Sequence, residues 1–312
     1  MPPLPTKTWA GVAGGTTKIS GGLTPLAAFS TSAGRRPTQQ DESLILDALF
    51  GSGQYKLYAV FDGHGNDGKK CADYAKQHIP EHLNNDRDHF MKDPIEALKA
   101  AFEATGRSLL EDSSIDTYMS GTTAVVAVLC VSERTVYIAN VGDSRAVVGR
   151  DVEEGEGWKA SQITRDHNCE VATERERVIS KGGRVEALVF DDGSPPGPLR
   201  VFKGSLPYPG LVVTRSLGDA VAHKLGVIST PDVFKVSIAP STRFLLIGSD
   251  GVFDGVSLPE VLSIVYSVCM RSGVSVQSAQ QGSDAITKAS LEGMDREQLD
   301  DNSTNVLVLF EQ

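Results

Sequence analysis

Two apolar runs of this chain end in the dipeptide Asp-Gly, and this repeated ending constrains the fold more than any other feature. The run YKLYAVF leads into Asp62, Gly63 and His64, and the run FLLIGS leads into Asp250. Short apolar runs that end in Gly and Asp are typical of buried strands whose ends open at a surface. The pattern therefore predicts carboxylates at the rim of a strand-rich core.

Further carboxylates stand beside other apolar runs. Asp143 follows TVYIANVG, Asp254 lies four residues beyond Asp250, and Asp301 precedes the final run NVLVLF. Carboxylate oxygens suit Mg²⁺ or Mn²⁺, whereas the histidines and cysteines lack the spacing of zinc ligands. Each Asp-Gly alone is more often a turn, and the GDS at Asp143 could simply join two paired strands. Taken together, the carboxylates predict a metal-dependent hydrolase and leave its reaction open.

Nine sequence blocks make this prediction more specific. They are GRRPTQQDE, YAVFDGHG, SGTTAVVAV, ANVGDSRAVV, ITRDHN, ERERVISKGGRV, LVVTRSLGD, FLLIGSDGVFDGVS and DDNSTNVLVLF. In this order they resemble the signature of the metal-dependent protein phosphatases of type 2C, the PPM family. The resemblance covers nearly the whole chain past residue 25. It implies an enzyme that hydrolyses phosphoserine and phosphothreonine in proteins.

The resemblance also implies an architecture. The expected fold is α+β, with two antiparallel β-sheets packed as a central sandwich, α-helices on both sides and a metal site at one rim. Because the blocks run from Arg36 to Asp301, residues 26–312 are expected to form one catalytic domain behind a flexible extension of residues 1–25. The stretch 191–210 is rich in Pro and Gly and is expected to be an irregular flap that shapes substrate choice.

The expected metal centre holds two ions, Mg²⁺ or Mn²⁺. By resemblance, Asp62 bridges the two ions, Gly63 offers its backbone carbonyl, and Asp250 and Asp301 complete the ligands. The water between the ions would be the nucleophile, because paired cations lower the pKa of bound water and clamp an in-line displacement.

Other acidic positions are expected at the edge of this centre. Asp143 and Asp254 correspond to a third, weaker metal position in the family. Gln40 and Asp41 correspond to an outer shell that holds metal-bound water, where most relatives have Glu-Asp. The amide of Gln40 removes one negative charge, so weaker affinity for one metal is expected.

Two further side chains are candidates for catalysis. Arg36 lies five residues before Asp41, as the phosphate-binding arginine of the family does. A guanidinium fork matches the oxygens of a phosphate monoester, and the neighbouring Arg35 is the better candidate for an ordinary surface arginine. His64 corresponds to the general acid that protonates the leaving alcohol, although a lone histidine in a turn is usually structural.

Helices are expected in four places. The capping patterns Asp93-Pro94-Ile95-Glu96 and Ser257–Glu260 each precede apolar residues at helical spacing. Residues 69–83 and 170–181 also have helical patterns, and Gly182-Gly183 stops the second of these.

Composition bounds the partners and the compartment. The 312 residues are 40% hydrophobic, enough for a full core, and the net charge of -10 argues against nucleic acid or an anionic membrane as a partner. The sequence shows no signal peptide, transmembrane run or myristoylation signal. Scattered cysteines predict buried free thiols and a reducing compartment, the cytoplasm or nucleus. A monomer acting on phosphorylated proteins is expected from the family.

Two alternatives stay open. A catalytically weak or inactive relative could act as a binding scaffold through its surface. A two-metal nuclease or peptidase would share the carboxylates but not the placement of the arginine and histidine.

Overall fold

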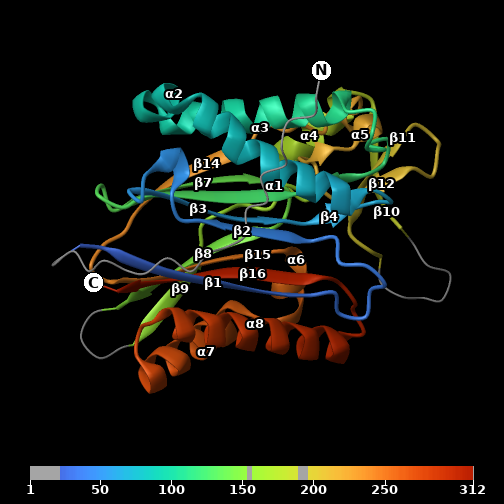
Figure 1. The fold of residues 1–312 in the computed structure, drawn as a ribbon. Coiled ribbons are helices and arrows are strands. Elements are labelled where there is room, and N and C mark those ends of the chain that lie inside the picture. Colours follow the sequence, from blue (N-terminus) through green and yellow to red (C-terminus); the bar gives the residue numbers. More distant parts are fainter. Residues whose placement is uncertain (1–21, 153–156, 189–195, 312) are drawn as a thin grey trace.

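The computed structural model describes residues 22–152, 157–188 and 196–311, which form layers of helix, sheet, sheet and helix (Figure 1). Two five-stranded sheets lie face to face, and every pairing within them is antiparallel. Helices cover the outer face of each sheet. This arrangement confirms the α+β sandwich expected from the sequence.

The strands come from distant parts of the chain. The first sheet has the order β14 (Asp232–Ser237), β7 (Thr135–Val141), β6 (Ala124–Cys130), β3 (Tyr55–Phe61) and β2 (Glu42–Leu46). The second has the order β1 (Thr24–Ser32), β16 (Ser303–Glu311), β15 (Thr242–Gly248), β8 (Arg145–Asp151) and β9 (Trp158–Gln162). The Asp-Gly runs therefore lie in opposite sheets, on β3 and β15.

Side chains alternate between the two faces of each strand, and on the central strands both faces are buried. On β3, Tyr58 and Val60 belong to the core between the sheets, whereas Leu57 and Phe61 belong to the core under the helices. The alternating faces of a strand explain this division. Because both sides of the central strands are covered by apolar residues, their ends are fixed firmly enough to position a site.

The four predicted helical segments are found as α1 (Gly68–Asn85), α3 (Pro94–Glu111), α7 (Leu258–Ser272) and the shorter α4 (Ala172–Ser180). The first sheet is covered by α1, α2 (Arg87–Lys92) and α3, and the second by α7 and α8 (Val276–Glu297). The remaining short helices are η1 (Leu49–Gly51), α5 (Ala220–His223) and α6 (Asp250–Gly255). Ser257 and Glu260 form the predicted capping box, and the Asp93 side chain accepts from the amides of Ile95 and Glu96.

The sequence did not predict α8, the longest helix of the described residues. Its buried face is built largely from small residues, including Ser283, Ser290 and Gly293, so an apolar period is weak. Small residues allow close packing. A Cβ on Gly293 would lie 1.7 Å from the carbonyl oxygen of Gly255 in α6, so only glycine permits this contact between the two helices.

Two smaller sheets complete the fold. One consists of β4 (Gly63–His64), β5 (Gly121–Thr122) and β13 (Leu217–Gly218), and the other of β10 (Gly183–Ala187), β11 (Leu199–Lys203) and β12 (Pro209–Leu211). The second corrects the expectation of an irregular flap over 191–210: Val201 and Phe202 are buried and pair with β10. Residues 189–195 lie outside the described residues.

Two other expectations concern the ends and the surface of the chain. β1 begins at Thr24, inside the predicted extension of residues 1–25, of which residues 1–21 lie outside the described residues. The first residue of β1, Thr24, pairs with Glu311.

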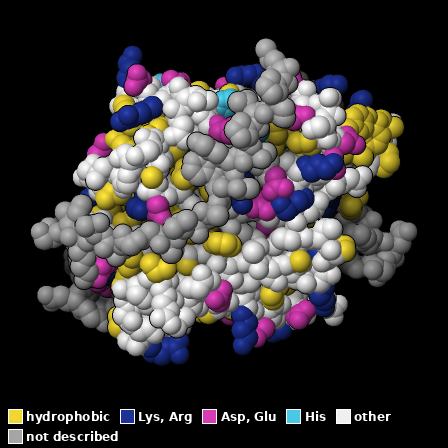
Figure 2. All heavy atoms as spheres, in the orientation of Figure 1, with side chains coloured by type: hydrophobic (Ala, Val, Ile, Leu, Met, Phe, Trp, Pro, Cys, Tyr) yellow, Lys and Arg dark blue, Asp and Glu magenta, His cyan; other side chains and the backbone are white. Residues whose placement is uncertain are grey.

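All four cysteines are free and buried, as predicted. Within the described ranges no helix is long and apolar enough to cross a membrane. Figure 2 shows acidic and basic side chains interspersed on the visible face.

Candidate metal centre and active site

The Asp-Gly endings of β3 and β15 meet at one rim of the sandwich. The side chains of Asp62 and Asp250 contact each other. Asp41 and Asp143 lie close enough for their charges to raise the pKa of Asp62 as well. Burial, followed by the charge of Asp250, raises the pKa of Asp62 well above its ordinary value. Two sequence segments almost 190 residues apart thus build one acidic centre.

The other predicted carboxylates surround this pair. Burial and the charge of Asp250 raise the pKa of Asp143 to about 8 and that of Asp254 to about 6. Burial raises the pKa of Asp41 to about 7, and Asp250 and Asp301 add to this shift. The pKa of Asp301 is raised by the same two causes, burial and Asp250. Every predicted metal carboxylate therefore lies within the electrostatic reach of Asp250.

Asp143 stands where the chain passes between the two sheets. The sequence left open a tight turn joining two paired strands at this position. That alternative is wrong, because β7 pairs with β6 and β14 while β8 pairs with β15 and β9. The crossing places Asp143 over the rim between the sheets, near Asp250 and His64.

The chemistry of this cluster fits divalent cations. Carboxylates that raise one another's pKa repel, and Oδ1 of Asp41 is buried without a hydrogen-bond partner in the described residues. No three His, Cys, Asp or Glu side chains among those residues are arranged to hold an ion directly. Mg²⁺ keeps several of its waters and binds through one or two carboxylates, so three direct side-chain ligands are not required.

A three-stranded sheet of two-residue strands carries His64. In it His64 pairs with Gly121, and Gly121 pairs with Gly218 on the other side. This pairing brings Asp219 to the imidazole: Nε2 of His64 lies 2.7 Å from Oδ2 of Asp219, which also accepts a hydrogen bond from Ser216. A Cβ on Gly121 would lie 2.2 Å from the same oxygen, so the contact requires glycine there.

The charge of Asp219 controls the imidazole. Burial lowers the pKa of His64, but the charge and hydrogen bond of Asp219 raise it by more, so the net shift is upward. The Asp219 side chain is 2% exposed, whereas that of His64 is 28% exposed. His64 is thus held by a buried carboxylate and is itself partly open to solvent. Sequence reasoning missed Asp219, although the block LVVTRSLGD contains it.

Arg36 contacts the acidic centre through Asp301. Its Nη2 is 3.1 Å from Oδ2 of Asp301, and its Nε donates to the carbonyl oxygen of Asp300 at 2.8 Å. Its side chain is 49% exposed. Arg35 turns away from the centre, since its guanidinium contacts Asp295 and the carbonyl of Leu299. The two arginines therefore have different surroundings, and only Arg36 contacts a carboxylate of the acidic centre.

Asn302 holds the loop that carries Arg36. Its Nδ2 donates to the carbonyl oxygens of Ala33 and Thr38, both at 3.1 Å, and its Oδ1 accepts from the amide of Gln40 at 2.8 Å. The buried side chain of Asn302 thereby joins the two ends of the loop of residues 33–40. Sequence reasoning missed this role too, because Asn302 follows Asp301 in the same block and no local pattern links it to residues 33–40.

Gln40 does more in the structure than its sequence position indicated. Its Nε2 donates to the carbonyl oxygen of Gly65 at 2.8 Å, and so ties the Arg36 loop to the turn after His64. A glutamate cannot make this bond, because a carboxylate has no hydrogen to donate. Neighbouring Gly63 is buried, and a Cβ there would lie 2.7 Å from the carbonyl oxygen of Gln40.

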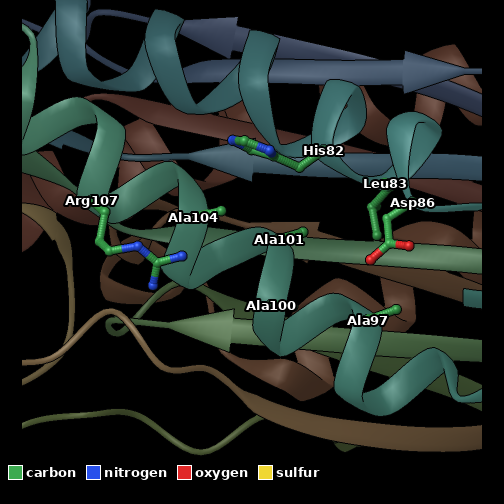
Figure 3. A pocket seen from close by; sticks show the side chains of 8 residues that line it. All are labelled: His82, Leu83, Asp86, Ala97, Ala100, Ala101, Ala104 and Arg107. Carbon is green, nitrogen blue, oxygen red and sulfur yellow. The ribbon is translucent and has the colours of Figure 1, made fainter. Parts of the chain in front are cut away.

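A separate hollow of about 200 Å³ lies between α1 and α3 (Figure 3). Alanines of α3 form much of its wall, and His82, Asp86 and Arg107 stand at its edges. None of the predicted site residues lines it. The hollow therefore belongs to the helical face of the molecule and not to the acidic centre.

Comparison with known proteins agrees with this geometry. Residues 28–297 match the sequence profile of the family described as Protein phosphatase 2C. The chain belongs to the protein phosphatase 2C family. Members of this family are metal-dependent hydrolases, using Mg²⁺ or Mn²⁺, that act on phosphoserine and phosphothreonine.

Individual relatives support the assignment. The chain is 35% identical over 256 residues to "Probable protein phosphatase 2C 64" of Oryza sativa subsp. japonica, a match that covers 80% of this chain and 58% of the relative. It is 35% identical over 290 residues to "Probable protein phosphatase 2C 61" of Arabidopsis thaliana, a match that covers 91% of this chain and 84% of the relative.

A solved structure shares the fold. The chain aligns with serine-threonine phosphatase 2C from Toxoplasma gondii at a TM-score of 0.78 and 20% identity, covering 91% of this chain and 94% of that chain. The type 2C architecture expected from the sequence is thereby confirmed for this member of the family.

Proposed function

We propose that this chain is an active protein serine/threonine phosphatase whose acidic centre holds two divalent metal ions. One observation carries the proposal: the Asp62 and Asp250 ends of opposite sheets converge in one acidic centre, whose Asp301 contacts Arg36 and whose Asp250 acts on His64. A phosphate monoester needs both neutralisation of its charge and a proton for its leaving group. This arrangement offers groups for both.

The metal-holding residues follow from the cluster. Asp62, the carbonyl of Gly63, Asp250 and Asp301 would hold two Mg²⁺ or Mn²⁺ ions. The outer positions would be Asp143 and Asp254 at a third ion, with Gln40 and Asp41 around the waters. When bound, the paired ions supply a water of lowered pKa as the nucleophile. The carboxylates neutralise the ions, and their mutual repulsion favours binding.

Arg36 binds the substrate phosphate. Its guanidinium is partly exposed and is oriented by Asp301 and by the carbonyl of Asp300. A planar guanidinium donates two parallel hydrogen bonds to a phosphate, which fixes the phosphorus relative to the acidic centre. Asn302 keeps the Arg36 loop in place.

His64 gives a proton to the leaving oxygen of serine or threonine. Expulsion of an alkoxide is slow without such a proton, and an imidazole titrates near neutral pH. Asp219 contacts Nε2 of the ring, so it positions His64 and favours the protonated form that a general acid requires. We therefore assign Asp219 as a positioning residue.

The flap and the domain organisation complete the proposal. We propose that residues 26–312 act as one catalytic domain and that the flap sheet, β10 to β12, shapes substrate choice. Exchange of residues 191–210 for the flap of a relative should change peptide preference. Unchanged preference would contradict this role.

Phosphate release tests the function. A phosphothreonine peptide should be hydrolysed with Mn²⁺ or Mg²⁺ and not with chelator, and a matched phosphotyrosine peptide should be a much poorer substrate. Absence of turnover with either metal, in protein shown to be folded by circular dichroism, would contradict the proposal and favour a binding scaffold.

A further inference from the structure

A second hollow of about 200 Å³ lies beside the proposed phosphate site. Its wall combines the end of β1 and the following loop with the last turns of α8 and the segment before β16. The lining residues are Ser32, Gly34, Arg35, Leu291, Met294, Asp295, Leu299 and Asp300. We call this hollow the Arg35 pocket.

The Arg35 pocket directly adjoins the groups that would bind phosphate and metal. Arg35 and Asp300 line it, and the next residue after each is Arg36 and Asp301 respectively. The two segments are packed tightly: a Cβ on Gly34 would lie 2.6 Å from the carbonyl oxygen of Asp301. Successive residues of an extended peptide advance by about 3.3–3.6 Å. A side chain within a few residues of a phosphate at Arg36 could therefore reach this pocket.

The charges of the pocket favour a cation. Arg35 is the single basic lining residue, and its charge is already paired: Nη1 lies 3.0 Å from Asp295, Nη2 donates to the carbonyl of Leu299, and its backbone amide donates to Asp300. The carboxylates of Asp295 and Asp300 and the guanidinium of Arg35 together give the lining a net charge of about -1. The Asp295 side chain is 64% exposed and can accept further hydrogen bonds.

The apolar wall suits a long side chain. Leu291, Met294 and Leu299 line the hollow, and Leu299 is 44% exposed. Lysine and arginine bury an aliphatic stem along an apolar surface while the charged end stays at a polar edge. The combination of Leu299 with Asp295 and Asp300 matches such a side chain better than it matches a short acidic one.

We propose that the Arg35 pocket is a specificity subsite that takes a lysine or arginine side chain of the substrate protein close to the phosphorylated residue. The proposal rests on the proposed phosphatase function, because it places the substrate by its phosphate at Arg36. It adds a substrate class: phosphoproteins with a basic residue beside the phosphoserine or phosphothreonine.

The test compares phosphothreonine peptides that carry Lys, Ala or Glu at each of the three positions before and after the phosphoresidue. The protein with Mn²⁺ should show an about three-fold higher kcat/KM for Lys than for Ala at one or two positions, in line with the strength of exposed ion pairs. Glu should be the poorest residue there.

The variant Asp295→Asn tests whether the lysine preference depends on the Arg35 pocket. This variant should raise KM about three-fold for the preferred Lys peptide, leave kcat unchanged and leave the Ala peptide unaffected. Asp284→Asn is the matched control, because it removes the same charge from α8, where Asp284 pairs with Gln280. It lies 11 residues away, about 16 Å along the helix and beyond the Debye length, so it should keep the preference.

The outcomes separate the two proposals. Turnover of p-nitrophenyl phosphate and of the Ala peptide reports the phosphatase alone, and its absence would overturn the proposed function. Normal turnover with no Lys preference at any position would overturn the subsite. A Lys preference that survives in Asp295→Asn, or that falls equally in Asp284→Asn, or a preference for Glu, would overturn it as well.

Discussion

Nε2 of His64 and Oδ2 of Asp219 are 2.7 Å apart, although 155 residues separate them in the chain. The two-residue strands β4, β5 and β13 create this contact, and Gly121 leaves the space for it. The pair connects the turn that carries Asp62, a proposed metal ligand, with the segment before α5. It gives the proposed general acid a fixed direction and a nearby negative charge.

Asp219→Asn tests this pair through the leaving group. The variant should lower kcat for a phosphothreonine peptide by about 10- to 100-fold, within the range that general acid catalysis contributes. It should lower kcat for p-nitrophenyl phosphate much less, because nitrophenolate leaves without a proton. Steady-state kinetics on both substrates check this, with His64→Ala as the reference for complete loss of the acid. An equal decrease on both substrates would contradict a role for Asp219 in positioning the acid.

Asn302→Ala should loosen the loop that carries Arg36. The variant loses two hydrogen bonds from Nδ2 and leaves the part-buried backbone amide of Gln40 without its acceptor, at a cost of about 1–3 kcal/mol in the free energy of unfolding. Because Arg36 then samples more orientations, KM for a phosphopeptide should rise several-fold. Urea denaturation and steady-state kinetics measure the two effects. A destabilised protein with unchanged KM would show that the loop does not depend on Asn302.

Metal binding should reverse a pH-dependent instability of the metal-free protein. The pKa values of Asp41 and Asp143 are raised to about 7 and about 8 by burial and by neighbouring carboxylates. Raised folded pKa values give stability that is present at low pH and is lost as pH rises from about 4 to about 8. With chelator, the midpoint of thermal unfolding should therefore be lower at pH 8 than at pH 6. Mn²⁺ should raise the midpoint more at pH 8 than at pH 6, and equal increments at both pH values would contradict the account.

Gln40→Glu should have opposite effects on metal affinity and on metal-free stability. Most relatives have a glutamate at the position of Gln40. Restoring this negative charge beside Asp41 should tighten the binding of one metal ion. The variant also loses the bond from Nε2 to the carbonyl of Gly65, so the metal-free protein should lose about 0.5–1.5 kcal/mol in its free energy of unfolding. Isothermal titration with Mn²⁺ and thermal unfolding with chelator check the two parts. Unchanged or weaker metal affinity would contradict the charge argument.

Glu174→Gln should destabilise the protein strongly at neutral pH. Glu174 is buried and accepts hydrogen bonds from Arg177, Arg215 and Thr214. Burial works to raise its pKa, but these bonds outweigh burial and hold the pKa well below its usual range. Removing one partner of a buried charge network costs about 3–5 kcal/mol.

The sign of this effect gives a pH test. A depressed folded pKa gives stability that is present above the unfolded pKa of about 4.3 and is lost at lower pH. The difference between wild type and Glu174→Gln in urea denaturation should therefore shrink below about pH 4. Glu176→Gln, an exposed neighbour on α4, is the control and should stay close to wild type. A difference that does not change with pH would contradict the role of the charge.

The sequence predicted the parts of the fold that depend on local pattern. Short apolar runs ending in Asp-Gly marked β3 and β15, and capping residues marked the starts of α3 and α7. The helix α8 was missed because a face made of Ser, Gly and Ala packs closely without an apolar period. β11 was missed because Pro and Gly on both sides of it hide a short alternating strand.

The site divides in the same way. The carboxylates could be predicted, since each follows or precedes an apolar run and the family blocks contain it. The partnerships of Asp219 with His64 and of Asn302 with Ala33 and Thr38 could not be predicted, because they join segments more than 150 residues apart. Nothing in the local sequence of either residue specifies its partner.

The most direct measurement of the central claim is phosphate release by Asp250→Asn from a phosphothreonine peptide across a Mn²⁺ titration. Asp250 contacts Asp62 and acts on every other carboxylate of the predicted centre. The account predicts turnover by the wild type that requires metal, and its loss in Asp250→Asn with the fold retained. Metal-dependent turnover that is undiminished in Asp250→Asn would contradict the assignment of this centre as the active site.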